Sequence, residues 1–161
     1  MIKEIHLRTE LVPADIGRIV RYHDEYYAEH YGFNHDFGTY VEEPLTEFYN
    51  RNSPMERIWL LEADGFLTGC IALTRVSAEE AQLRWFYVDE SIRGKGHGQD
   101  LIDRLIIFAR EQNYQRIILW TVSLLTEARR VYERNGFKLV VEHPTSIWGK
   151  VLVEQKFVKE L

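Results

Sequence analysis

Apolar and polar residues follow two periods along this chain, one of two residues and one near 3.6, which predicts strands and helices in succession. The alternation from Ile2 to Arg8 predicts a first strand. A helix is expected from Pro13, since proline suits a first helical turn, to a stop at Gly32. A second helix is expected over Asp36–Asn50, with Pro44 breaking or kinking it. Its inward face is expected to carry Phe37, Tyr40, Val41, Leu45 and Phe48.

A meander of three strands is predicted after a clear loop at residues 50–54. The strands are Arg57–Ala63, Leu67–Val76 and Ala81–Val88, with Asp64-Gly65 as a tight turn between the first two. An amphipathic helix follows, with Leu101, Ile102, Leu105, Ile106 and Ala109 on its apolar face. The remaining elements are a strand at Arg116–Val122, a helix at Thr126–Asn135, a strand at Phe137–Glu142 and a long final strand at Ser146–Phe157.

The most informative segment is Arg93-Gly94-Lys95-Gly96-His97-Gly98, between the strand that ends at Val88 and the amphipathic helix. Its glycines remove side chains where the chain enters the helix. The first turn of a helix has backbone N–H groups without intrahelical partners, and the helix dipole favours an anion there. Arg93 and Lys95 add positive charge beside these donors. The main-chain amides of residues 93–98 are therefore predicted to bind a diphosphate.

Spacing excludes two common phosphate loops. A P-loop requires G-x-x-x-x-G-K-[ST], and no hydroxyl residue follows a Gly-Lys pair in this chain. A dinucleotide-binding turn requires G-x-G-x-x-G, and counting from Gly94 and Gly96 the third glycine is replaced by Gln99. The alternative is a flexible, glycine-rich surface turn. The position of the segment between a strand and a helix, and between two cations, argues against that alternative.

At these residues the sequence resembles the GNAT-type N-acetyltransferases. The acetyl-CoA signature of that family, Q/R-x-x-G-x-G/A, is met by Arg93, Gly96 and Gly98. A second family element, A-x-x-x-Y-x-x-x-G-F, is met by the run from Ala128 to Phe137, in the family's order and spacing. The resemblance covers residues 56–143 well. The segment Trp120–Thr126 looks closest to acetyltransferase domains that are often fused to MarR-type regulators.

This resemblance implies an α/β, GNAT-like fold, with a mixed, mostly antiparallel central sheet of about seven strands flanked by about four helices. It implies one acetyltransferase domain over residues 1–161, which transfers acetyl from acetyl-CoA to a primary amine of a small molecule or peptide by direct attack. The strand before the glycine loop is expected to splay from its neighbour. Its main chain at Phe86, Tyr87 and Val88 would then be free to pair with the pantetheine arm.

Tyr132 is the candidate catalytic acid, because a phenol with a pKa near 10 stays protonated at neutral pH and can donate to a leaving thiolate. Packing against the core is the alternative role for this side chain. Leu125 replaces an Asn that contacts the cofactor in many family members, and Ser123 or Thr126 is the polar substitute nearby. The candidate cofactor-binding residues are Phe86, Tyr87, Val88, Arg93, Gly94, Lys95, Gly96, His97, Gly98 and Ser123. Arg129, Arg130 and Arg134 are expected either at the 3′-phosphate or in solvent.

Composition narrows the class of partner. A chain of 161 residues suits one domain with a sizeable core. The formal net charge of −5 argues against nucleic acid and is compatible with a cationic amine substrate. Cys70 is the single cysteine and lies in an apolar run, so buried packing is expected and a disulfide framework is excluded. No signal peptide or apolar span is visible, which predicts a cytoplasmic location and no membrane partner.

The general base is not readable from the sequence. The acidic candidates are Glu79 and Glu80 at the start of the third meander strand, and Asp24, Glu25 and Glu29 on the first helix. Aromatic residues are dense in the segment expected to shape acceptor specificity, either as core or as an aromatic wall for a cationic or apolar substrate. They are Tyr22, Tyr26, Tyr27, Tyr31, Phe33, Phe37 and Tyr40. No metal is expected, because His23, His30 and His35 have no partner at ligand spacing.

Two other classes of function stay open at this level. A non-catalytic acyl-CoA binding or sensing module is suggested by Leu125 and by the unassigned base. An interaction protein that keeps only the fold is the other, with the terminal strand Ser146–Phe157 pairing across a homodimer. CoA binding separates this last class from the first two. Release of thiol from acetyl-CoA on a panel of amines separates an enzyme from a sensor.

Overall fold

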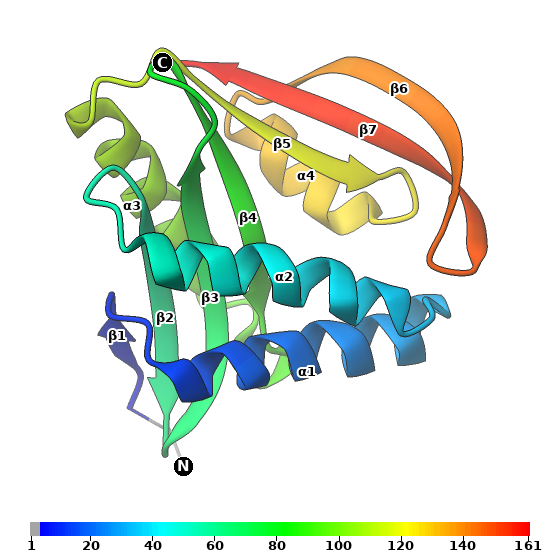
Figure 1. Cartoon of the computed structure of the whole chain (residues 1–161), viewed down its shortest axis with the longest axis horizontal. Helices are drawn as coiled ribbons and strands as arrows, with labels where there is room; N and C mark the ends of the chain where they lie inside the picture. Colours follow the sequence, from blue (N-terminus) through cyan, green and yellow to red (C-terminus); the bar gives the residue numbers. More distant parts are fainter. Residues whose placement is uncertain (1–3) are drawn as a thin grey trace.

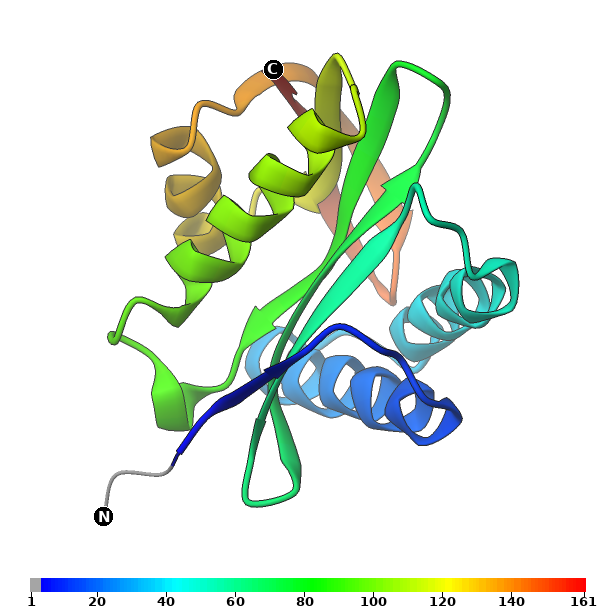
Figure 2. The same ribbon diagram turned by 90° about the vertical axis from the view of Figure 1, so that its left-hand side faces the viewer.

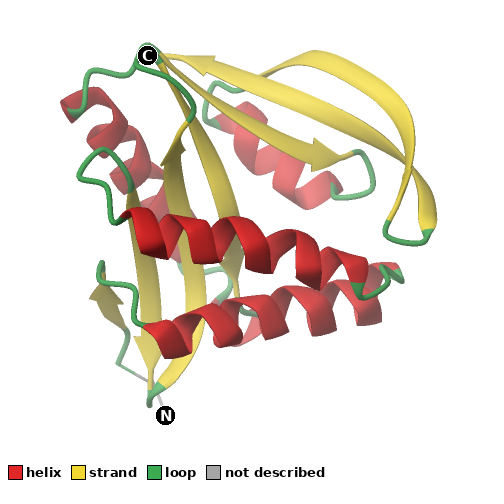
Figure 3. Cartoon of the chain, viewed as in Figure 1, coloured by secondary structure: helices red, strands yellow, loops and turns green. Residues whose placement is uncertain are grey.

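The computed structural model describes residues 4–161, so the start of the predicted N-terminal strand, residues 1–3, lies outside the described residues. The elements follow the predicted order of a strand, two helices, three strands, then helix, strand, helix and two strands. Figure 3 shows how these helices and strands are arranged in space. The strands are β1 (His6–Arg8), β2 (Arg57–Ala63), β3 (Phe66–Arg75), β4 (Glu80–Val88), β5 (Arg116–Val122), β6 (Lys138–Ile147) and β7 (Lys150–Glu160). The helices are α1 (Pro13–Tyr31), α2 (Asp36–Arg51), α3 (His97–Glu111) and α4 (Thr126–Arg134), with a short 3₁₀ helix, η1 (Glu90–Ile92), after β4.

One sheet holds all of these strands in the order β1-β2-β3-β4-β5-β7-β6. Every neighbouring pair is antiparallel except β4 and β5, which run parallel. Helices α1 and α2 cover one face of the sheet, and α3 and α4 cover the other (Figures 1 and 2). The predicted mixed, mostly antiparallel sheet of seven strands with four helices is therefore confirmed over the described part of the chain.

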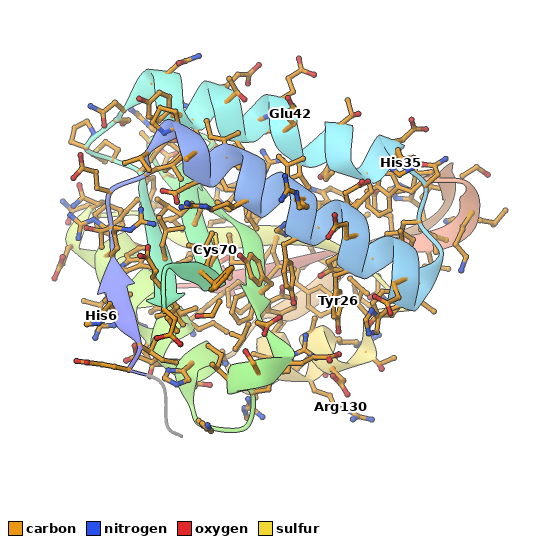
Figure 4. All side chains as sticks on the ribbon, turned by 90° about the horizontal axis from the view of Figure 1, so that it is seen from below. His6, Tyr26, His35, Glu42, Cys70 and Arg130 are labelled. Atoms are coloured by element: carbon orange, nitrogen blue, oxygen red, sulfur yellow. The ribbon has the colours of Figure 1, made fainter. Side chains whose placement is uncertain are left out.

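Each face of the sheet has its own hydrophobic core. On strand β3, Ile71 packs with the α3 residues Leu101 and Leu105, whereas its neighbour Cys70 packs with Ile19 of α1 on the opposite face. This alternation follows from the period of two in a strand. Cys70 lies in the interior beneath α1 (Figure 4), and burial raises the pKa of its thiol. The prediction of buried packing for Cys70 is confirmed.

The start of α1 is fixed by a buried ion pair. The Asp15 carboxylate is fully buried in the first turn of the helix and accepts hydrogen bonds from the backbone N–H of Val12 at 2.9 Å and from Arg8 of β1 at 2.7 Å. Arg8 also contacts Glu62 of β2 at 2.9 Å. Burial by itself would raise the pKa of Asp15, but these hydrogen bonds outweigh burial and hold the pKa below its usual range. The pair thus ties α1 to the edge of the sheet.

Helix α2 excludes a break at Pro44, one of the two effects predicted for this proline, and corrects the predicted position of Tyr40. The helix continues through Pro44 to Arg51, so the proline does not break it. Val41 before the proline and Leu45 after it are both buried in the same core, and this packing outweighs the lost backbone hydrogen bond. Tyr40, predicted to point inward, is 47% exposed.

The C-terminal strands correct a second prediction. Ser146 belongs to β6, and the chain then turns at Trp148 and Gly149, both of which have positive φ, before β7 begins at Lys150. Strand β7 lies between β5 and β6 and is paired with both. From Glu154 to Val158 the terminal strand is paired on both sides, so this part has no free edge for pairing across a dimer, and the edge strand at this side of the sheet is β6.

Strands β4 and β5 separate after a short paired stretch. Their pairing ends at Gln82 and Ile118, and beyond it the two strands diverge (Figure 1). Trp85, with a φ of 51°, forms a bulge on β4, since it and Phe86 together face Ile71 of β3. Residues 83–88 of β4 therefore have no described partner on the β5 side. The predicted splay before the glycine loop is confirmed.

None of the helices within residues 4–161 is long and apolar enough to span a membrane.

Candidate active site

The glycine loop leaves a row of backbone donors unpaired at the start of α3. Gly94 and Gly96 have φ values of 78° and 86°, in the left-handed region that glycine adopts without strain. Within the described structure, the N–H groups of residues 94–99 donate to no acceptor, and the first donor that follows is Asp100, which bonds the Gly96 carbonyl at 3.0 Å. The Arg93 N–H is already bonded to Glu90. The free donors are therefore residues 94–99, one residue later than predicted.

A pocket opens beside these donors, and we call it the glycine-loop pocket. It has an empty volume of about 1190 Å³, counting the space open to solvent. Its walls come from α1, from the end of β4, from the loop and from α4. They include Tyr22, Tyr26, Tyr27, Tyr31, Phe86, Tyr87, Val88, Arg93, Gly94, Gly96, His97, Gly98, Ala128, Val131 and Arg134. Most of the predicted cofactor-binding residues are thus brought together on one surface.

Two predicted cofactor residues do not line this pocket. Lys95 is exposed on the loop but is not part of the pocket wall. Ser123 lies beyond the end of β5, where its N–H donates to the Val153 carbonyl of β7 at 2.9 Å. Arg134, at the end of α4, is the only one of the three α4 arginines in the wall. Arg129 instead pairs with Glu133 on its own helix, and Arg130 points outward (Figure 4).

The side chain of Arg93 braces the mouth of the pocket. Its Nε donates to the Val88 carbonyl at 2.7 Å, and its Nη2 donates to the Tyr26 hydroxyl at 3.1 Å. Figure 4 shows Tyr26 on the side of α1 that faces α4. Arg93 therefore joins the end of β4 to α1, and its role in this structure is to position the pocket walls.

A second pocket, which we call the aromatic pocket, lies on the α1–α2 face of the sheet, where β4 and β5 diverge. Its empty volume is about 810 Å³, counting the space open to solvent. Tyr27, Phe33, Phe37, Tyr40 and Trp148 form an aromatic wall. The predicted aromatic wall is therefore present, and the hairpin turn between β6 and β7 completes it with Trp148, whose ring lies 4.6 Å from that of Phe37.

The two pockets meet at three side chains. Tyr27 of α1, Phe86 of β4 and Leu125 at the start of α4 line both. Leu125, the residue that departs from the family pattern, thus lies at the junction. The junction falls where β4 has lost its β5 partner, so no strand pairing closes the sheet between the two pockets at this point.

Tyr132 lies in the wall of the aromatic pocket near this junction. The side chain is buried, with ring centroids 6.3 Å from Phe86 and 6.0 Å from Phe137. Burial raises its pKa, so the phenol keeps its proton at neutral pH. The alternative role in core packing and the role of acid are both compatible with this position, since the residue lines the pocket and contacts the core.

None of the predicted bases lies in either pocket wall. Glu80 pairs with Arg116 at 2.7 Å, and Asp24 pairs with His35 at 3.0 Å. In the described structure, the carboxylate that lines the aromatic pocket is Glu154 of β7, which the sequence analysis missed. The alternation of polar and apolar residues on the final strand was the available signal for Glu154. The sequence alone does not show which face of the sheet Glu154 occupies, because that depends on how β7 pairs with β5.

His23 also lines the aromatic pocket, and it is neutral at physiological pH. Burial lowers its pKa to about 4. Its Nδ1 lies 2.8 Å from the Ile19 carbonyl, so we assign the proton to Nδ1, leaving Nε2 without one. Within residues 4–161, no group of three or more His, Cys, Asp or Glu side chains is placed to hold a metal ion.

Comparison with known proteins identifies the family. The family model described as "Acetyltransferase (GNAT) family" matches residues 19–137. The chain belongs to this family. The uncharacterized N-acetyltransferase YjgM of Escherichia coli (strain K12) is 32% identical over 151 residues, which cover 91% of this chain and 87% of the relative. The N-acetylaspartate synthetase of Xenopus tropicalis is 34% identical over 101 residues, 60% of this chain and 37% of that protein.

Solved structures of acetyltransferases share the fold. A GNAT-family acetyltransferase from Staphylococcus aureus Mu50 has a TM-score of 0.79 at 20% identity, with 98% of this chain and 99% of that chain covered. YncA, a putative acetyltransferase from Salmonella typhimurium solved with its cofactor acetyl-CoA, has a TM-score of 0.76 at 19% identity and coverage of 98% and 94%. As a member of the GNAT family, the chain is an acyltransferase, and acetyl-CoA is the acetyl donor that this family uses.

Proposed function

We propose that this acetyltransferase moves the acetyl group of acetyl-CoA to a primary amine of a small molecule or peptide. The observation that carries the proposal is the junction at Phe86 and Leu125, where a pocket rich in free backbone donors meets a pocket with aromatic walls. Two substrates that enter from opposite sides can react there by direct attack, without a covalent enzyme intermediate.

The residues of the glycine-loop pocket fit acetyl-CoA. The unpaired N–H groups of residues 94–99 lie at the N-terminus of α3, where a diphosphate is favoured. The unpaired edge of β4 at residues 86–88 supplies main-chain groups for the pantetheine arm. Arg134 lines this pocket, which supports it as the α4 arginine that contacts the 3′-phosphate.

Within this proposal, the chain has three tasks. The bound acetyl-CoA supplies an acyl thioester. The free main-chain N–H groups of the splayed β4 stabilise the negative charge that develops on the carbonyl oxygen. The Tyr132 hydroxyl donates a proton to the departing thiolate. The aromatic pocket excludes bulk water and orients the amine toward the junction.

One experiment separates this proposal from a non-catalytic CoA-binding module. The purified protein is incubated with acetyl-CoA and a panel of amines, and the release of CoA thiol is recorded alongside a calorimetric titration with CoA. Thiol release that depends on an amine supports the transferase. Saturable CoA binding without thiol release on any amine would instead indicate a non-catalytic sensor. The absence of CoA binding would indicate a protein that shares the fold of the family but not its activity.

The cytoplasmic location, a homodimer and the closeness of Trp120–Thr126 to MarR-fused acetyltransferase domains stay predictions from the sequence. If two copies associate, we propose the exposed edge strand β6 as the contact, because β7 is enclosed. Leu139, Val140 and Val141 are exposed on that strand.

A further inference from the structure

Arg84 is a half-buried cation without an anionic partner in the described structure. It lies on β4, two residues before Phe86, and lines the aromatic pocket. Within residues 4–161 it donates no hydrogen bond and forms no ion pair, and its recorded contact is with the ring of Trp85, 5.1 Å from the guanidinium carbon. By contrast, Arg51 and Arg116 each pair with a glutamate at 2.9 and 2.7 Å. A guanidinium in a pocket with its donors unused is suited to an anionic group of a ligand.

Glu154 supplies the opposite charge on the other side of the same pocket. It lies on β7 and is paired with Val122 of β5. Val122 in turn precedes Leu125 by three residues. Its carboxylate is 29% exposed and lies 3.5 Å from Nε2 of His143, which is itself half exposed. Arg84 and Glu154 are the charged residues of the aromatic pocket, one of each sign, and no ion pair joins them. They flank the junction from the β4 side and from the β5–β7 side.

Aromatic rings form another part of the wall of this pocket. Phe33 and Phe37 pack with Trp148 at ring distances of 5.0 and 4.6 Å, and Tyr40 packs on the same indole at 5.5 Å. This wall can hold an apolar or aromatic side chain and offers it no charged partner.

We propose that the aromatic pocket selects an α-amino acid with an apolar side chain, whose carboxylate pairs with Arg84 and whose amino group is held by Glu154 beside the junction. The inference rests on the proposed function, because it names the acceptor class of the same site. An acceptor with both charges satisfies both residues at once. A simple amine or polyamine would leave Arg84 unpaired and would place an additional cation beside it, which is unfavourable in a half-buried site.

The test compares three acceptors that share one side chain: phenylalanine, phenylalanine amide and phenethylamine. The kcat/KM for each is measured from CoA thiol release. We expect phenylalanine to exceed the other two by about tenfold or more, since a charged hydrogen-bonded pair is lost in both. Arg84→Gln is expected to lower kcat/KM for phenylalanine by about tenfold and to leave that for phenethylamine unchanged or raised, because the cation that disfavours a simple amine is removed. Glu154→Gln is expected to lower kcat/KM for all three.

Controls make the result specific. Arg110→Gln removes an exposed arginine of α3 that lines neither pocket, and it should leave all three values unchanged. Arg84→Lys keeps the charge but lacks the planar guanidinium group. Its kcat/KM for phenylalanine should lie between the values of wild type and Arg84→Gln. CoA affinity, measured by calorimetry, reports whether each variant is folded.

The failures are distinguishable. If the amine and the amide are acetylated as well as phenylalanine, or if Arg84→Gln lowers all three equally, the acceptor class is wrong while acetyl transfer stands. If CoA binds but phenylalanine is neither acetylated nor bound by the CoA complex, this inference fails, whereas the proposed function fails only if no amine of the wider panel is acetylated.

Discussion

The backbone N–H of Asn34 donates a hydrogen bond of 2.9 Å to the carbonyl oxygen of Trp148. This bond joins the α1–α2 connection to the turn between β6 and β7, two segments that lie more than a hundred residues apart in the sequence. Lys150 adds a second link, since its Nζ donates to the Tyr31 carbonyl at 2.7 Å. The turn is thereby held over the aromatic pocket, with the Trp148 indole in its wall.

Trp148→Ala should therefore weaken acceptor binding. Removal of the indole opens the wall, and we expect the KM for the acceptor to rise by about fivefold or more while the KM for acetyl-CoA is unchanged. Steady-state kinetics with each substrate varied in turn measures both values. Phe66→Ala, which removes an exposed aromatic residue at the start of β3, is the matched control. Equal effects of the two substitutions would contradict a role for the Trp148 turn.

Tyr132→Phe tests the proton donor. We expect kcat to fall by about tenfold or more, with the Kd for CoA unchanged, because the ring keeps its packing and only the hydroxyl is lost. Thermal unfolding of the variant should match wild type, since within residues 4–161 the hydroxyl makes no recorded hydrogen bond. An unchanged kcat would leave Tyr132 with the packing role alone.

Local patterns predicted the elements, and long-range pairing supplied what was missed. Strands β2 and β5 and the turn at Asp64-Gly65 could be predicted to the residue, because periodicity and turn chemistry are local. Arg84 and Glu154 could not be placed together, since they are 70 positions apart and their shared pocket depends on the bulge at Trp85 and on the register of β5 with β7.

The same limit explains the remaining errors. Pro44 is tolerated because the buried residues Val41 and Leu45 on either side of it hold the helix against the core. Helix propensity does not include such tertiary packing. The free backbone donors begin at residue 94 and not at Arg93, because the N–H of Arg93 is bonded to Glu90 of η1. The short helix η1 has no clear signal in the sequence. In both cases, tertiary context decided between two locally acceptable structures.

Gly96→Ala should weaken CoA binding through the backbone. Gly96 has a φ of 86°, and a Cβ there would meet no atom within 4 Å, so the cost is conformational strain in the donor turn and not a clash. We expect the Kd for CoA to rise by about tenfold. Gly65→Ala is a close match, with a φ of 78° and equally open space, but it lies in the β2–β3 turn. Gly65→Ala should lower stability to a similar extent and leave CoA affinity unchanged. An equal loss of CoA affinity in Gly65→Ala would contradict a specific role of the glycine loop in CoA binding.

Asp15→Asn tests the ion pair at the start of α1. The loss of the buried carboxylate partner of Arg8 should lower the free energy of unfolding at pH 7 by about 3 kcal/mol, measured by urea denaturation. Glu133→Gln, which breaks an exposed pair on α4, should change it by less than about 0.5 kcal/mol.

The pH dependence gives an independent measurement of the same pair. Because the folded-state pKa of Asp15 lies below its unfolded value of 3.8, its contribution is present above pH 3.8 and is lost as the pH falls through the folded-state pKa. Wild type should therefore lose more stability than Asp15→Asn between pH 5 and strongly acidic conditions. Equal acid sensitivity of the two proteins would contradict the assigned lowering of the pKa.

The central claim is that the free amides at the start of α3 bind the diphosphate of CoA. Calorimetric titration of the wild-type protein with CoA and with pantetheine, which lacks the diphosphate and the nucleotide, tests it most directly. The account predicts saturable binding of CoA and a loss of about 100-fold or more in affinity for pantetheine. Pantetheine binding as tight as that of CoA, or no saturable signal with CoA, would contradict it.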